Sequence, residues 1–127
     1  MSTQAQLRSR YAREAVTTAS PAQLVVMLYD RLLKDLQVAE ATIQSGDIQG
    51  SHAALVHAQD ILHELNATLD TSVWKEGEAL KRLYEWCIEQ LINANLAKTV
   101  EGVLNAREVL EPIADAWRQV ATGAIGS

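Results

Sequence analysis

The sequence predicts an all-α protein, an antiparallel up-down four-helix bundle with a mobile N-terminal arm. Three observations predict it. The chain has 127 residues, the length of one domain. Four segments repeat apolar side chains in steps of three and four. No segment alternates with a period of two, and no Asn-Gly or Asp-Gly pair marks a hairpin. We expect an arm over residues 1–19, the bundle over 20–121 and a frayed tail over 122–127.

The first helix is predicted from its start signal. Ser20 suits the N-cap, Pro21 the first helical position and Gln23 the capping box. The helix should run to about Ser45 and stop at Gly46. Its side chains in the predicted core are Val25, Tyr29, Leu32, Leu36, Ala39 and Ile43.

Three further helices follow the same logic. Asp47 can cap the second, from Ile48 to about Leu69, and the third and fourth should span about 77–97 and 100–121. Pro112 lies inside the fourth helix, where it should cause a kink or a break one residue earlier. Trp74, in the connector before the third helix, should pack against a bundle end. The three core stripes are Leu55, Ala58, Leu62, Leu65 and Leu69; Leu80, Tyr84, Cys87, Leu91 and Ala94; and Val103, Ala106, Leu110, Ile113, Trp117 and Val120.

Charge and hydropathy exclude several classes of protein. The net charge is −5, and residues 1–20 carry +2, from Arg8, Arg10 and Arg13 against Glu14, so the remainder holds −7. An acidic body argues against binding nucleic acid. No apolar run approaches the roughly 18 to 20 residues that span a bilayer, and no signal-peptide segment opens the chain. With one cysteine, the chain is expected to be cytoplasmic, without membrane insertion.

The residues that usually carry catalysis do not form a recognisable set. All three histidines, at positions 52, 57 and 63, fall on the second helix, and no two have the i, i+4 spacing of a shared metal site. We interpret them as solvated. Cys87 lies on a core stripe and is expected to be a small buried hydrophobe. We therefore expect neither an enzyme nor a metal or other cofactor.

Apolar side chains also lie outside the core stripes. On the first and third helices they are Leu24, Met27, Leu28, Ile88 and Ile92. They predict a groove that binds another chain, which Leu7 and Tyr11 of the arm, spaced i, i+4, could cover when it is empty. Three alternatives stay open: these faces touch neighbouring helices of the bundle, they form a structural homodimer, or the chain is a small helical enzyme that uses Cys87 or the histidines.

The order of several short motifs resembles the FliS family, the flagellar secretion chaperones of flagellin. The matching residues are Tyr11, Val16, Thr18-Ala19-Ser20-Pro21, Leu24, Met27-Leu28-Tyr29-Asp30, Gly46-Asp47, Ala58-Gln59-Asp60-Ile61, Glu64-Leu65, Leu69-Asp70, Leu83-Tyr84, Ala94-Asn95-Leu96 and Trp117. Family members often have a Gly-Gly pair before the third helix, where this chain reads Trp74-Lys75-Glu76-Gly77.

The resemblance implies a fold and a function. It implies a helical bundle that binds the disordered C-terminal segment of flagellin in the cytoplasm and prevents premature polymerisation. It further implies delivery of flagellin to the flagellar type III export apparatus, with export-gate and other flagellar proteins as candidate further partners. It places the region of Tyr11 over part of the empty groove.

Overall fold

The computed structural model describes residues 3, 6, 20–69 and 76–123. Four long helices account for nearly all of these residues: α2 (Pro21–Gln44), α3 (Ile48–Ala67), α4 (Gly77–Ala97) and α5 (Glu101–Ala121). The described ranges contain no strand. The all-α prediction is confirmed, with helix starts that agree within one residue. None of the helices in these ranges has a stretch long and apolar enough to cross a membrane.

The residues at the two ends of α2 cap and terminate the helix as the sequence predicts. The Ser20 hydroxyl accepts a hydrogen bond from the Gln23 backbone N–H at 3.2 Å, and the Gln23 side chain accepts one from the Ser20 N–H at 2.8 Å. Gly46 ends the helix with φ of +75°, a conformation that glycine adopts without strain. Asp47 then caps α3 by accepting from the Gly50 N–H at 2.9 Å. These local contacts join two helices through a very short turn.

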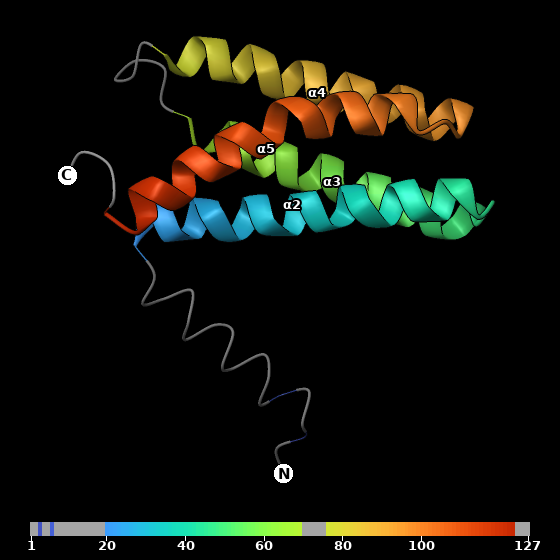
Figure 1. The fold of residues 1–127 in the computed structure, drawn as a ribbon, viewed down its shortest axis with the longest axis horizontal. Helices are drawn as coiled ribbons and strands as arrows, with labels where there is room; N and C mark the ends of the chain where they lie inside the picture. The colour runs from blue at the N-terminus through green and yellow to red at the C-terminus, as the bar shows by residue number, and fades with distance from the viewer. Residues whose placement is uncertain (1–2, 4–5, 7–19, 70–75, 124–127) are drawn as a thin grey trace.

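Each helix packs against two neighbours in a closed ring. The helix α2 contacts α3 and α5, and α4 contacts the same two, so α2 and α4 lie on a diagonal (Figure 1). Two ion pairs show that α2 and α5 are antiparallel. Arg118 near the end of α5 reaches Asp30 near the start of α2 at 2.7 Å, and Arg107 reaches Glu40 at 2.8 Å. The up-down arrangement is therefore as predicted.

The core is aliphatic, with one hydroxyl pair at its centre. The predicted stripes supply most of it; the fully buried side chains include Leu32, Leu36, Leu55, Leu62, Leu91, Val103 and Leu110. Tyr29 and Tyr84 meet across the diagonal between α2 and α4, with their hydroxyl oxygens 2.6 Å apart. Cys87 is fully buried, as predicted, and its thiol is free. The interior thus contains three buried ionisable groups, the phenols of Tyr29 and Tyr84 and the thiol of Cys87.

Burial of these groups predicts an alkaline limit to stability. Loss of solvation raises the pKa of Cys87 to about 12 and raises the pKa of Tyr29 and of Tyr84. Since the folded state resists ionisation that the unfolded chain permits, stability is full below about pH 9, the ordinary thiol value, and falls as the pH rises toward 12. Urea midpoints measured between pH 7 and 11 should decrease above pH 9. A flat profile would contradict the burial of the three groups.

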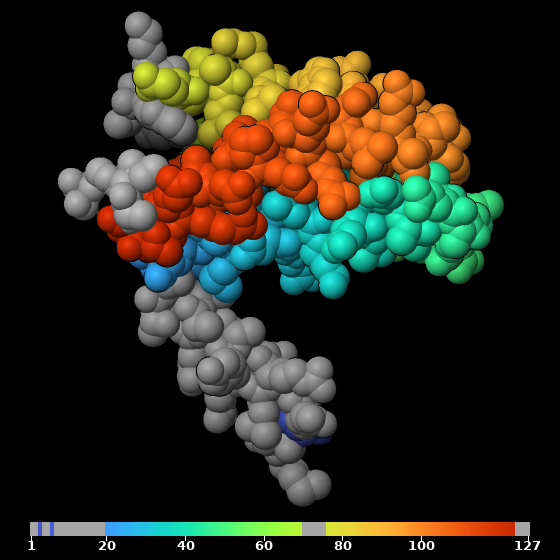
Figure 2. Space-filling view, in the orientation of Figure 1, coloured from blue at the N-terminus to red at the C-terminus, as the bar shows by residue number. Residues whose placement is uncertain are grey.

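The helix α5 approaches α4 closely at one end and leaves it at the other. At Gly102 an added Cβ would lie within 3.0 Å of the carbonyl oxygen of Gln90, so the two backbones nearly touch there. Pro112 does not break α5, which is continuous. Figure 1 instead shows its axis changing direction, which is the kink that proline causes by removing one backbone hydrogen bond. Beyond it, the end of α5 lies against the start of α2 (Figure 2).

Candidate functional site

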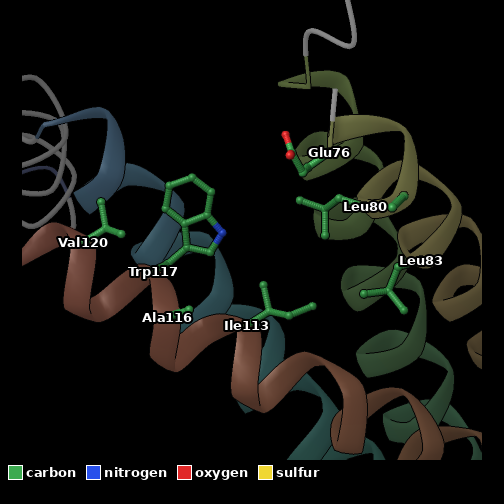
Figure 3. A pocket seen from close by; sticks show the side chains of 8 residues that line it. Glu76, Leu80, Leu83, Ile113, Ala116, Trp117 and Val120 are labelled. Atoms are coloured by element: carbon green, nitrogen blue, oxygen red, sulfur yellow. The ribbon is translucent and has the colours of Figure 1, made fainter. Parts of the chain in front are cut away.

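The departure of α5 from α4 leaves an apolar space between them, here called the α4–α5 hollow. It has a volume of about 500 Å³. Figure 3 shows Trp117 and Ile113 on α5 across from Leu80 and Leu83 on α4. Its remaining lining residues are Glu76, Ala79, Ala116 and Val120. Apart from the carboxylate of Glu76 at its margin, this space offers a partner only hydrophobic contact and the indole N–H of Trp117.

A second space, the bundle-end hollow, opens at the same end of the molecule. It has a volume of about 350 Å³ and is lined from all four helices and the residues that flank α3. Its lining residues are Pro21, Leu24, Val25, Leu28, Leu65, Thr68, Leu69, Leu80, Tyr84 and Trp117. Leu80 and Trp117 also line the α4–α5 hollow, so the two spaces lie next to each other.

A third space, the α2–α3 hollow, continues the series onto the other side of the bundle. It has a volume of about 420 Å³ and lies between Leu24, Met27, Leu28 and Arg31 of α2 and Glu64 and Thr68 at the end of α3. Leu24, Leu28 and Thr68 belong to the bundle-end hollow as well. The three hollows therefore adjoin one another in a series from α4 and α5 over the bundle end to α3, where Arg31 and Glu64 are the charged lining residues.

The structure brings together only part of the predicted site. Leu24, Met27 and Leu28 line one hollow, although their role in binding remains a prediction. The prediction that Ile88 lines the groove is corrected by its burial. Only 8% of Ile88 is exposed and it packs in the core, so it offers a partner almost no surface. Ile92 is 42% exposed but lines none of the three hollows. The arm residues 7 and 11, and Trp74, lie outside the described residues.

The sequence interpretation missed the α4–α5 hollow. It assigned Leu80, Ile113, Trp117 and Val120 to the core stripes, since their spacing is the same as that of the buried residues. Val120 is instead exposed, and the other three are half-buried around open space. The available signal was Pro112, which comes just before this group. A kink at that point turns the following stripe away from the neighbouring helix.

Several polar side chains on the other surfaces of the described residues pair with one another. His57 pairs with Asp35 across α2 and α3, so it is not simply solvated as predicted, and His52 lies 3.0 Å from the amide nitrogen of Asn95. At the end of the bundle where α4 and α5 approach closely, the side-chain amide of Asn105 donates a hydrogen bond to the side-chain oxygen of Gln90 at 3.2 Å. Among residues 20–69 and 76–123, no three histidine, cysteine, aspartate or glutamate side chains gather as a metal site.

These features define a class, a helical bundle with adjoining apolar hollows on its surface. Comparison with known proteins then identifies the family. The sequence model of FliS, described as flagellar protein FliS, matches residues 3–124. The chain belongs to the FliS family of flagellar secretion chaperones, which places it among the chaperones of flagellar export.

Individual relatives agree with this family. The chain is similar to the flagellar secretion chaperone FliS of Salmonella typhimurium, with 35% identity over 84% of this chain and 81% of the relative. It is 28% identical to that of Bacillus subtilis, over 86% of this chain and 81% of the relative. A solved structure described as a flagellar chaperone from bacteria has the same fold, with a TM-score of 0.75, 20% identity, and coverage of 95% of this chain and 99% of that one.

Proposed function

We propose that this protein binds the disordered C-terminal segment of flagellin in the cytoplasm, prevents its premature polymerisation and delivers it to the flagellar type III export apparatus. The observation that carries the proposal is the adjacency of the three apolar hollows, which share lining residues at one end of the bundle. Family membership supplies the flagellar context. The hollows provide apolar surface that a bound segment can cover, so binding needs no covalent chemistry.

The physical basis is helix-in-groove recognition. A disordered segment that folds into amphipathic helices can place apolar side chains into such hollows. Each fully buried aliphatic side chain contributes roughly 1.5 to 3 kcal/mol, and ordering the segment offsets much of this gain. A client held in this way is protected while bound and remains releasable for export. Leu24, Met27 and Leu28 are the anchors we propose on α2, with Leu83 and Trp117 on the opposite side.

A pull-down with flagellin tests the proposal. The purified protein should retain full-length flagellin and should lose nearly all binding when the C-terminal segment of flagellin is removed. That segment, fused to an unrelated soluble carrier, should be sufficient for capture, with the carrier alone as the control. Undiminished capture of flagellin that lacks its C-terminal segment would rule out the proposed mechanism.

A further inference from the structure

The outer face of the bundle between α3 and α4 lies apart from the three hollows. Two side-chain contacts show how the antiparallel helices align there. The amide nitrogen of Asn95 lies 3.0 Å from Nδ1 of His52. The Lys98 ammonium donates a hydrogen bond to the Ser51 hydroxyl at 3.2 Å. The exposed residues around and beyond these contacts are here called the α3–α4 face, and none of them lines a hollow. They are Ile48, Val56, Asp60, Glu85, Glu89, Ile92 and Leu96.

One half of the α3–α4 face is apolar. On α3, Ile48 is 67% exposed and Val56 is 38% exposed. On α4, Ile92 is 42% exposed and Leu96 is 81% exposed. The first two lie one turn to either side of residue 52 and the other two lie on either side of residue 95, so the contact between residues 52 and 95 brings all four together. Single exposed apolar side chains are ordinary, whereas a cluster that spans two helices is typical of a protein-contact surface.

The other half of the α3–α4 face is acidic. Asp60 follows Val56 by one turn of α3. On α4, Glu89 precedes Ile92 by three residues and Glu85 precedes Glu89 by one turn. All three carboxylates are exposed, and neither helix has a lysine or arginine within these segments. The face therefore changes from apolar to negatively charged along its length.

Charge and size limit what can cover this face. A second copy of the chain, with a net charge of −5, would be repelled as it approached the carboxylates, whereas a segment with lysine or arginine would be attracted. From Glu85 to Leu96 the face is roughly 17 Å long, since a helix rises about 1.5 Å per residue. A helix of about three turns covers that length.

We propose that the α3–α4 face binds a short amphipathic helix of a second protein, aliphatic in one half of its contacting side and rich in lysine or arginine in the other, and that it does so while the hollows hold a client. The aliphatic half provides affinity by burial. The basic half sets the direction of the helix, because the reversed helix would place its charges on Ile92 and Leu96. This site goes beyond the proposed function and does not depend on the identity of the client.

Synthetic helical peptides of about 15 residues test the chemistry. In the block peptides, leucines occupy the contacting side of one half and lysines that of the other, with alanine and glutamine elsewhere. Two block peptides, with the leucine half first or last, allow for either helix direction. In the control peptide the same leucines and lysines alternate along that side. By calorimetric titration of the full chain, the tighter block peptide should bind at least about tenfold more tightly than the control, and equal affinities would overturn the proposal.

Two pairs of matched variants locate the binding. Leu96→Ser should weaken the block peptide about tenfold, whereas Leu104→Ser, at a leucine of α5 that is 42% exposed, should not. Glu89→Lys should weaken it about fivefold, less as salt is added, whereas Glu108→Lys at an exposed glutamate of α5 should not. Control variants that lose as much affinity as their counterparts would overturn the proposal, because binding would then follow total charge or hydrophobicity alone.

The remaining measurements test the other possible occupants. Protein saturated with the C-terminal flagellin segment should bind the block peptide as tightly as the free protein does. Displacement of the peptide by that segment would assign the α3–α4 face to the client and overturn the proposal. Light scattering should give the same molar mass for the wild type and Leu96→Ser, and a dimer formed by the wild type alone would make a second copy the occupant. If flagellin does not bind at all, the proposed function fails, and the peptide titrations still decide this inference.

Discussion

Replacing Met27 by glutamate is expected to weaken binding of the C-terminal flagellin segment by at least about thirtyfold, a hot-spot effect. Met27 is 43% exposed and lines the α2–α3 hollow beside Leu24 and Leu28. A bound helix would remove the new carboxylate from water, and a charge buried against apolar side chains is strongly unfavourable. Stability should change little, because the free protein leaves this position in solvent and Arg31, one helical turn away, can pair with the new charge. Calorimetric titration and urea unfolding measure the two effects.

Ile92→Glu is the matched control for this experiment. Ile92 is 42% exposed, almost the same as Met27, but it lies on α4 outside the three hollows. The same charge introduced there should change flagellin affinity less than about threefold, as substitutions away from the central contacts do. Equal losses in the two variants would extend the client surface onto this face of α4. Loss of stability in Met27→Glu would instead assign Met27 to the core.

The elements could be predicted because their limits depend on neighbouring residues. The capping box of Ser20 and Gln23 and the turn at Gly46 are made within a few residues of chain, and the sequence shows them directly. The stripe through Tyr29 and Leu36 predicts burial for the same reason, because helical periodicity alone puts these side chains on one face. Fold class and helix bounds follow from such local rules.

The site could be predicted only in part because it depends on the angle between helices. Helical periodicity places Leu80 on the core stripe of α4 and Ile88 beside that stripe, which is the reverse of their burial. Ile88 is covered because its neighbours are close, and Leu80 faces open space because α5 has turned away. No periodicity in α4 records the path of α5. The sequence did indicate Leu24, Met27 and Leu28, which line the α2–α3 hollow, because six apolar residues in a row exceed what one buried face requires.

The path of α5 depends on how closely it can approach α4, which leads to a second prediction. Gly102→Ala should lower the free energy of unfolding by about 1–3 kcal/mol, the usual cost of forcing an extra group into a packed interface. The new methyl group would come within 3.0 Å of the Gln90 carbonyl oxygen and 3.2 Å from the Cβ of Ala94. Since the first of these atoms belongs to the backbone, a rotamer change cannot relieve the contact, and the helices themselves must separate.

This result would run against intrinsic helix propensity, which makes the prediction specific. Alanine is better than glycine inside a helix by about 1 kcal/mol, so propensity alone predicts that Gly102→Ala is stabilising. Asn93→Ala on the exposed face of α4 is the control that reports propensity without a packing change, and it should leave stability equal or slightly higher. Urea unfolding of the two variants beside the wild type measures the difference. A Gly102→Ala protein as stable as the control would show that α4 and α5 can shift apart at no cost, and close contact at Gly102 would then not determine how widely the α4–α5 hollow opens at the other end.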